Sequence, residues 1–455
     1  MCKKIILVQP SYPTSPFPGP HLPVGLGYLA EQLIKAGIDY VVVDLSVNDF
    51  TYFKDMILSF APDFIGISLM SLDIDHHYTL ISKIKTQFPF IKIIAGGPHV
   101  SFMKEEVLSD CPSIDFGIVH EGEESLIELI QSSTPIGIKG IIYRTDNTIV
   151  YNGDRDFIQN LDKYQFPKYE KFDLPKYGKM IAIASSRGCP FNCIFCGAHF
   201  SMGKKWRSRS AESIIKEIDF WYRAGYINFN FVDSNLFFNK RRIIEICDKI
   251  KIKGLNITIS SDGMRADDAD VEMLQKMKEI GLTSVAIGVE SANETILKNI
   301  KKGESLFQIE NAITTCIKLD INVVLFFIIG LPGETKENVE KSFEFALKYP
   351  VSEAYFFNVN PMPKTELYKW AEENNYLLTS KKDMFKNIGG MDRNPLVVTP
   401  ELSYNERKEL YEKGLQISKE IRCNSVRRTM EKTLFGCIKY RVAKALLFFK
   451  SGAGM

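Results

Sequence analysis

Short apolar runs rich in Val and Ile recur along the first third of the chain and alternate with segments of helical spacing. Within these runs polar residues are few, which is typical of parallel strands buried on both faces. The strand-like runs are 4–9, 39–45, 64–70, 91–97 and 114–120. The helical segments between them are 25–37, 51–62, 79–89 and 101–110. We therefore expect an α/β fold that begins with a doubly wound parallel sheet over residues 1–140.

The same alternation restarts near residue 180 and repeats six times. The expected strands are 180–186, 227–233, 256–262, 284–290, 321–330 and 353–360. The expected helices are 211–224, 240–253, 268–280, 305–319, 336–348 and 365–375. Six β/α units are fewer than the eight of a closed barrel, which predicts a partial (β/α)6 TIM-like barrel over residues 180–375. Residues 141–179 are predicted to form a hairpin and linker, and residues 376–455 a small, mainly helical unit.

Composition narrows the class of protein. A chain of 455 residues is too long for one core, and its net charge of +2 gives no general attraction for nucleic acid. The first apolar run is too short for a signal peptide, and no stretch of 18 apolar residues occurs. We therefore expect a cytoplasmic protein with reduced thiols.

Three cysteines stand close together in the string RGCPFNCIFC, directly after the first barrel strand. Cys189, Cys193 and Cys196 are near enough in sequence to bind one metal centre. A structural zinc site completed by His199 is one interpretation. The other is a 4Fe–4S cluster, which three cysteines would hold with one iron left open. The remaining cysteines are scattered and are expected to be small buried or surface residues; they are Cys2, Cys111, Cys247, Cys316, Cys423 and Cys437.

This CxxxCxxC spacing, with the aromatic Phe195 before the third cysteine, resembles the motif of the radical SAM superfamily. The resemblance implies that Cys189, Cys193 and Cys196 hold a catalytic 4Fe–4S cluster. In that family the open iron binds the amino and carboxylate groups of S-adenosylmethionine, and reductive cleavage gives a 5′-deoxyadenosyl radical. It also implies an electron donor such as flavodoxin or ferredoxin.

Polar motifs at later strand ends are similar to those of the same superfamily. They are VDSN at 232–235, IGVES at 287–291 and FFIIGLPGET at 326–335. The resemblance implies that Asp233 contacts the methionine portion of S-adenosylmethionine and that Glu290 and Ser291 contact its ribose or amino groups. It assigns the adenine to the backbone of Ile329, Gly330 and Leu331. Judged without the resemblance, Glu290 is a strand-end carboxylate paired with a helix N-terminus or a nearby lysine.

The N-terminal sheet carries its own set of loops at the strand ends, where open parallel sheets bind ligands. These loops resemble the cobalamin-binding domain that precedes the barrel in cobalamin-dependent radical SAM enzymes. The residues that the resemblance assigns to cobalamin are Ser68, Gly96, Gly97, Pro98, Glu121 and Gly122. A general nucleotide site is the alternative, but no G-x-G-x-x-G follows the first strand.

The histidine pattern that ligates cobalt in other cobalamin proteins, D-x-H-x-x-G, is absent. His21 lies in the corresponding loop without that pattern, and His76, His77, His99 and His120 lie in other loops. We therefore expect cobalamin to bind without a histidine on cobalt.

The expected reaction is methylation of an unactivated carbon through methylcobalamin. Cyclisation or another rearrangement that uses cobalamin without methyl transfer is the alternative within the class. A methylthiotransferase would need cysteines for a second cluster, and Cys2 and Cys111 are too few. A cobalamin or cluster sensor is the non-enzymatic alternative. The substrate is expected to be a small or lipid-like molecule.

The chain ends in a segment with the spacing of a basic amphipathic helix. From Leu434 its apolar face is formed by Ile438, Val442, Ala445, Leu446 and Phe449. Lysines occupy its other faces, which favours peripheral contact with the inner face of the membrane. Docking of the same helix on the barrel is the equal alternative.

Overall fold

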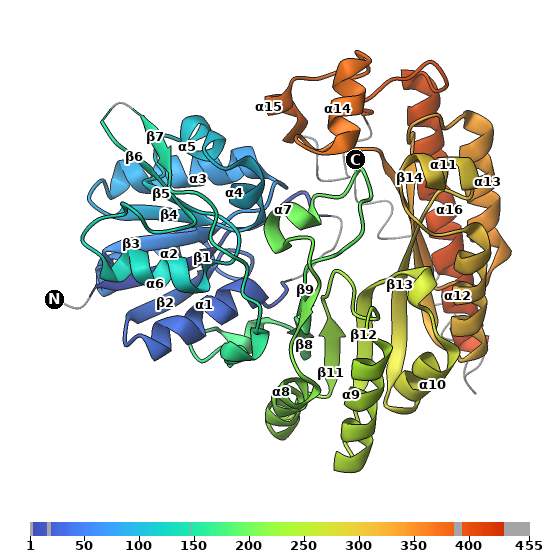
Figure 1. Cartoon of the computed structure of the whole chain (residues 1–455), viewed down its shortest axis with the longest axis horizontal. Coiled ribbons are helices and arrows are strands. Elements are labelled where there is room, and N and C mark those ends of the chain that lie inside the picture. The colour runs from blue at the N-terminus through green and yellow to red at the C-terminus, as the bar shows by residue number, and fades with distance from the viewer. Residues whose placement is uncertain (1–2, 16–19, 147, 386–393, 432–455) are drawn as a thin grey trace.

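The computed structural model describes residues 3–15, 20–146, 148–385 and 394–431. The chain forms two α/β bodies side by side, one built on the N-terminal sheet and the other on a barrel-like sheet (Figure 1). Helix α7 (Ala198–Met202) lies between them. The predicted amphipathic helix from Leu434 falls outside the described residues and stays a prediction.

The N-terminal sheet has the strand order β2-β1-β3-β4-β5-β6-β7. Its first five strands are parallel, which confirms the doubly wound sheet; they are β1 (Lys4–Gln9), β2 (Asp39–Asp44), β3 (Phe64–Ser68), β4 (Lys92–Gly96) and β5 (Phe116–Ile118). Alternate residues of β1 enter different cores: Ile5 and Leu7 pack on one face, and Ile6 and Val8 pack on the other. The apolar runs lack alternation because both faces of the sheet are covered.

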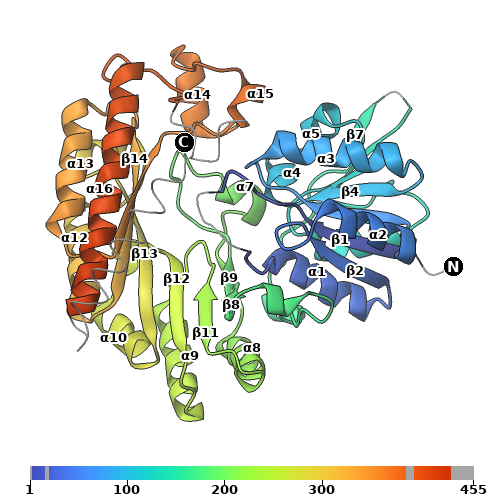
Figure 2. The same cartoon turned by 180° about the vertical axis from the view of Figure 1, so that it is seen from behind.

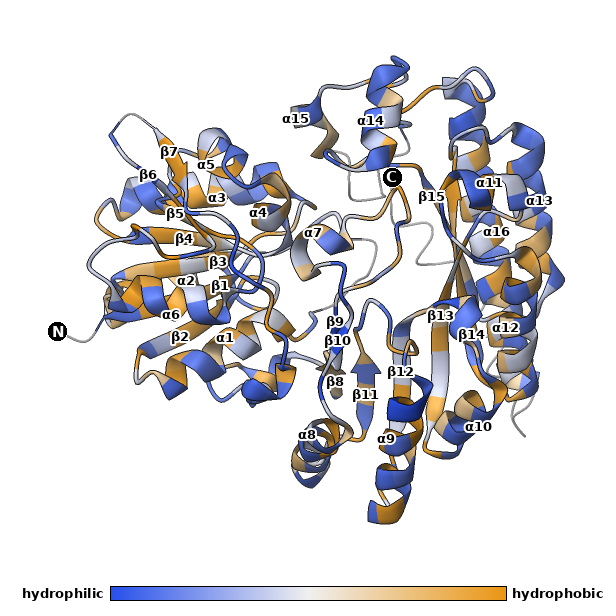
Figure 3. Ribbon diagram, viewed as in Figure 1, coloured by the Kyte–Doolittle hydropathy of each residue, from blue (hydrophilic) through white to orange (hydrophobic). Residues whose placement is uncertain are grey.

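Two helices cover one face of this sheet and four cover the other. Helices α1 (Val24–Lys35) and α6 (Gly122–Gln131) share the core of Ile5. The opposite face carries α2 (Phe50–Phe60), α3 (Ile74–Gln87), α4 (Pro98–Met103) and α5 (Glu106–Asp110). The single helix expected at 101–110 is in fact two, because Lys104 between them has a φ of 55°. Strands β3 and β4 are orange and the surrounding helices carry blue residues in Figure 3.

The predicted hairpin at 141–152 is present as β6 (Ile141–Arg144) and β7 (Ile149–Tyr151). It extends the N-terminal sheet, because β6 pairs antiparallel with β5. The segment that follows is largely irregular, with short 3-10 turns at Leu161–Lys163 and Leu174–Lys176.

The second sheet is an open, all-parallel arrangement of six strands in the order β15-β14-β13-β12-β11-β8, as predicted for a partial barrel. The strands are β8 (Met180–Ile183), β11 (Asn228–Phe231), β12 (Thr258–Met264), β13 (Leu282–Glu290), β14 (Asn322–Ile329) and β15 (Glu353–Asn358). Its predicted helices are α8 (Ala211–Arg223), α9 (Lys240–Lys253), α10 (Val271–Glu279), α12 (Leu306–Lys318), α13 (Lys336–Lys348) and α14 (Glu366–Glu373). A short helix α11 (Glu294–Asn299) was not predicted. Each predicted helix begins after a side chain that caps its first amide groups; these are Ser210, Asn239, Asp270, Ser305, Thr335 and Thr365.

The long helix α16 (Tyr404–Glu431) joins the barrel instead of forming a separate core. It lies beside α13 on the outer side of the sheet (Figure 2). Gly414 allows α16 to pack closely on β15, because a Cβ at that position would lie only 2.8 Å from the Cβ of Phe356. Among the described helices, including the short α15 (Lys381–Met384), none is both long and apolar enough to cross a bilayer.

Candidate active site

The three clustered cysteines lie on one loop between the two sheets. The loop follows the short strand β9 (Ser186–Arg187), which pairs antiparallel with β10 (Arg207–Ser208). Gly188 turns the chain with a φ of 86°, and a Cβ there would lie 2.3 Å from the carbonyl oxygen of Lys205. The loop is held at its start by Cys189, whose amide donates to Gly203 O at 3.2 Å. Close backbone packing therefore fixes where the first cysteine stands.

All three cysteine side chains are free thiols of intermediate exposure. Burial raises the pKa of the Cys193 thiol to about 11, while the nearby cations Lys302 and Arg265 act to lower it. Burial also raises the pKa of Cys196. Arg265 itself lies over the ring of Phe191, 3.4 Å from the ring centre. A cluster with thiolate ligands is anionic, and these two cations are placed to offset its charge.

Among the described residues, no three His, Cys, Asp or Glu side chains lie close enough together to share one metal ion. In a 4Fe–4S cluster each cysteine binds a different iron, so the ligands stand further apart than those of a single ion. Three accessible thiols on one loop beside Lys302 and Arg265 fit such a cluster. Phe195, the aromatic residue of the motif, is partly buried against the barrel core.

Asp233 is buried at the end of β11, where it binds the segment that leads into the cysteine loop. Its carboxylate accepts from the Ser185 amide at 3.2 Å and from the Ser185 hydroxyl at 2.8 Å, and it also accepts from the Ser186 hydroxyl. Burial raises the pKa of Asp233. In this structure the carboxylate thus holds the chain just before the cysteines in place.

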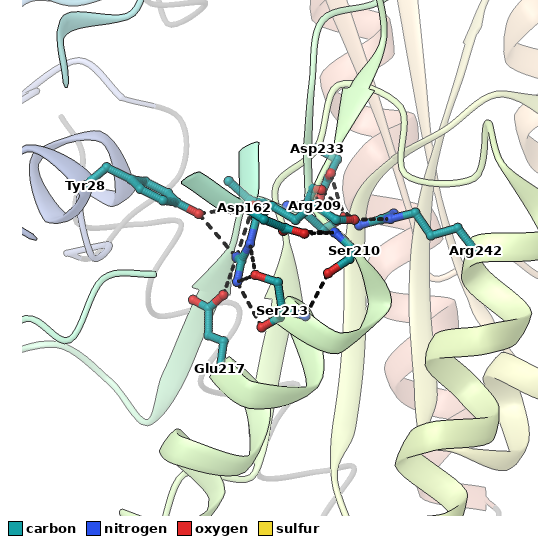
Figure 4. Close-up of polar contacts among 10 residues, drawn as sticks. Tyr28, Asp162, Arg209, Ser210, Ser213, Glu217, Asp233 and Arg242 are labelled. Carbon is teal, nitrogen blue, oxygen red and sulfur yellow. Dashed lines mark hydrogen bonds and ion pairs between the residues drawn. The ribbon is translucent and has the colours of Figure 1, made fainter. Parts of the chain in front are cut away.

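A larger polar network continues from this point to helix α1 of the N-terminal domain (Figure 4). Arg242 donates to the carbonyl oxygens of Arg209 at 2.7 Å and Ser185 at 2.9 Å. The Arg209 guanidinium forms an ion pair with Glu217, and both side chains are 1% exposed. Arg209 also donates to the Tyr28 hydroxyl on α1 at 3.2 Å. The cysteine loop and the N-terminal domain are therefore connected through buried hydrogen bonds.

Glu290, at the end of β13, has a φ of 64° and is paired with Lys302 at 3.0 Å. This is the lysine pairing expected if its carboxylate is only a strand-end group. Lys302 also contacts Glu304 at 3.2 Å. Because Lys302 is close to Cys193 as well, the ion pair brings Glu290 to the same site as the cysteines.

The loop after β14 is held by two residues that sequence reasoning missed. Glu334 accepts from the amides of Gly330 at 2.7 Å and Leu331 at 3.2 Å, and from the Ser291 hydroxyl at 2.7 Å. Burial raises the pKa of Glu334 to about 7. Arg407 of α16 donates to Gly330 O at 3.0 Å from the other side. The backbone polar groups of Gly330 are therefore already bonded, as is Ile329 O, which accepts from Val359 N at 2.9 Å.

A cleft between the two bodies contains all the residues predicted at the N-terminal strand ends. Its space is about 1260 Å³, including the part open to solvent, which is room for a large ligand. The predicted residues that line it are Ser68, Gly96, Gly97, Pro98, Glu121 and Gly122. The missing side chain of Gly96 leaves space there, since a Cβ would meet only Ile118 at 3.9 Å. At Gly97 a Cβ would instead lie 2.8 Å from Leu69 O, so glycine is needed here for the chain to turn close to the backbone of Leu69.

The opposite wall of the cleft comes from the segment that leads into the cysteine loop. Ser186 and Arg187 line the cleft directly before Gly188. Arg187 pairs with Glu121 at 3.0 Å and with Glu123 at 2.6 Å, which are both on the N-terminal domain. Arg207 of β10 adds a 2.8 Å contact with Glu121. This ion-pair network ties the ligand cleft to the cysteine loop.

Of the histidines in the N-terminal loops, none of which was expected to bind cobalt, His120 lines the cleft and His21 is exposed. The Nε2 atom of His120 contacts Asp154 at 2.9 Å. His99 is buried against Ser71 and Tyr78, and burial lowers its pKa to about 3.

Two family models match the chain in the order that the fold shows. Residues 14–130 match the B12 binding domain and residues 183–346 match the radical SAM superfamily. An uncharacterized methyltransferase of Pyrococcus horikoshii is 34% identical over 368 residues, which is 78% of this chain and 80% of that protein. The chain belongs to the radical SAM superfamily, within the group that carries an N-terminal cobalamin-binding domain. Its cofactors are a 4Fe–4S cluster, S-adenosylmethionine and cobalamin.

More distant relatives match this chain over most of its length. The anaerobic magnesium-protoporphyrin IX monomethyl ester cyclase of Cereibacter sphaeroides is 24% identical over 80% of this chain and 63% of its own length. The radical S-adenosylmethionine methyltransferase TsrM of Kitasatospora setae, solved with cobalamin and a 4Fe–4S cluster, superposes with a TM-score of 0.73. That match covers 91% of this chain and 86% of TsrM at 19% identity, and it shows that the fold is shared.

Proposed function

We propose that this enzyme transfers a methyl group to an unactivated carbon of a small-molecule or lipid-like substrate. One observation carries the proposal: Arg187, two residues before Cys189, forms part of the wall of the cobalamin cleft. Bound together, the cofactors supply reductive cleavage of S-adenosylmethionine and methyl transfer to a substrate carbon. Radical and methyl chemistry would then meet at one interface between the domains.

The chain's own residues would position the cofactors and exclude water. Cys189, Cys193 and Cys196 would hold the cluster beside Lys302 and Arg265, whose charges offset its own. Ser291, Glu290 and the loop at 329–331 would lie along S-adenosylmethionine, with Glu334 and Arg407 fixing the loop from behind. Asp233 would act on the same ligand through the Ser185–Ser186 segment that it binds.

The cobalamin side would be formed by the cleft residues Ser68, Gly96, Gly97, Pro98, Glu121 and Gly122. Glu121 has a second function, since its carboxylate accepts from Arg207 and Arg187 and from the amide of Ile158 at 2.7 Å. An electron donor of the flavodoxin or ferredoxin type would reduce the cluster. We place the reaction in the cytoplasm.

Cyclisation is the second candidate, because one relative is named a cyclase. Methylation is favoured by the relative of higher identity, which is named a methyltransferase. The experiment is an anaerobic incubation of reconstituted enzyme with S-adenosyl[methyl-14C]methionine, cobalamin, a reductant and a small-molecule extract. Methylation predicts deoxyadenosine, S-adenosylhomocysteine and label in a new product, and both deoxyadenosine and labelled product should be absent with Cys196→Ala. Deoxyadenosine formed without label in any product would instead favour cyclisation.

A further inference from the structure

The inner face of the barrel sheet differs in character from one side to the other. On β14 and β15 alternate side chains are buried against the outer helices; Phe327 contacts Phe345, and Phe356 contacts Phe343. Because successive strand residues point to opposite faces, Phe326, Tyr355 and Phe357 lie on the inner face. Each of these three is only half-buried.

The three inner rings form one aromatic surface across the two strands. Phe326 and Tyr355 are paired residues whose ring centres are 5.4 Å apart with planes at 15°. Phe357 lies 6.2 Å from each of them, at 17° from Phe326 and 11° from Tyr355. Arg422 of α16 donates to the Tyr355 hydroxyl at 3.1 Å. Phe326 and Tyr355 stand at the same level of the sheet, and Phe357 lies two residues nearer the carboxyl ends of the strands. The Tyr355 hydroxyl is already bonded, so the rings of Phe326 and Phe357 are the apolar part of this surface.

The other side of the inner face is polar. Ser260 on β12 donates to Asn230 Oδ1 on β11 at 2.7 Å, and the Asn230 amide donates to Asp262 at 2.9 Å. Between the two sides runs β13, whose inner positions before Glu290 include the small residues Ala286 and Gly288. The Glu290 carboxylate and Lys302 cover Gly288, since a Cβ there would lie 3.0 Å from Lys302 Nζ, so a molecule that crosses β13 would lie over Ala286. A molecule lying across β13 would thus have rings on one side, hydrogen-bonding groups on the other and the cysteine site at its end.

We propose that this face binds a substrate with a flat, unsaturated ring system that packs on Phe326 and Phe357, and with a polar group that faces Asn230, Ser260 and Asp262. Aromatic rings prefer stacked or edge-on aromatic partners over saturated groups of equal size. The substrate class rests on the proposed function, because the ligand is taken to be the molecule that is methylated. If the rings serve only to cover an edge strand, no preference for planar molecules exists.

The test uses 1-pyrenemethanol, a planar fluorescent alcohol, with the full-length holoenzyme, and the saturated cyclododecanol as competitor. We expect pyrenemethanol to bind and cyclododecanol to compete at least tenfold less well. Phe326→Leu and Phe357→Leu keep apolar volume but remove the ring, and each should weaken pyrenemethanol binding about five- to tenfold. Phe307→Leu is the control, because Phe307 is 70% exposed on α12.

Equal competition by cyclododecanol, or unchanged binding in both inner-face variants, would overturn the substrate class. Circular dichroism of each variant shows that any loss is not unfolding, and Phe326→Tyr, which retains the ring, should restore binding. Deoxyadenosine formation without substrate is measured in parallel. Label transfer from S-adenosyl[methyl-14C]methionine into an extract product is measured as well. If both deoxyadenosine and labelled product form while planar binding fails, the substrate inference is wrong and the proposed function stands.

Discussion

Replacing Arg209 by methionine leaves the Glu217 carboxylate buried without its cation. Both side chains are 1% exposed, so water does not replace the lost partner. Removal of one member of a buried ion pair costs about 3–5 kcal/mol, whereas replacing both by apolar groups is often neutral. The Ser213 hydroxyl and the Tyr28 hydroxyl also lose a donor in the variant. Arg209→Met should therefore be much less stable than Arg209→Met/Glu217→Leu.

Thermal unfolding of the apo protein measures this difference. A change of 1 kcal/mol corresponds to about 2–4 °C in Tm for a domain of this size, so the single variant should lose roughly 6–20 °C. The double variant should lie within about 4 °C of the parent. Arg223→Met is the control, because its pair with Asp219 is exposed and should change Tm by less than about 2 °C.

The pH dependence gives a second check of the same reasoning. Burial already raises the pKa of Glu217, and loss of Arg209 should raise it further. The folded variant then binds a proton more tightly than the unfolded chain, so its free energy of unfolding should increase as pH falls through the raised pKa. The double variant lacks the carboxylate and should lack this increase. If the double variant is as unstable as the single variant, the loss of stability comes from altered packing and not from the unpaired Glu217 carboxylate.

Three further predictions concern the site. Replacing Cys189, Cys193 and Cys196 together with alanine should abolish the cluster, which is expected to hold about four irons per chain, and also deoxyadenosine formation. An iron assay and chromatography measure these two losses. A retained cluster would contradict the assignment. Gly96→Trp should fill the cleft and abolish cobalamin absorbance while iron is retained, and retained cobalamin would place the ligand elsewhere. Burial raises the pKa of Glu334 to about 7, so the free energy of unfolding should fall as pH rises from about 4.5 to 7. Glu334→Gln should lack that component of the slope in urea unfolding.

The elements of the fold could be predicted largely from local patterns. Uninterrupted apolar runs, helical spacing and capping residues such as Ser305 and Thr335 are short-range signals, and the six barrel units confirm them. The break at Lys104 was missed because a positive φ at a lysine has no marker in the sequence. The attachment of the hairpin at 141–151 to β5 was missed because strand pairing is decided by which edge is open.

In the candidate site, the cysteine loop and the glycines of the cleft could be predicted from the sequence. Each of these motifs lies within a short segment, so its spacing is visible without the structure. Arg407 and Gly330 are 77 residues apart, and Arg187 and Glu121 are 66 residues apart. Arg and Glu are common surface residues, so nothing in the sequence indicates that Arg407, Arg187 and Glu121 are buried and bonded to distant segments. Only the packed domains show that they are.

The sequence by itself determined two α/β units, their order and the cysteine chemistry, because periodicity and motif spacing act over a few residues. Tertiary structure decided that the two ligand-binding ends face one another, with Arg187 and Tyr28 joining them. It also decided that Phe326, Tyr355 and Phe357 share one inner surface. The physical reason is that burial and ion pairing depend on distances between segments far apart in the chain, which local spacing does not encode.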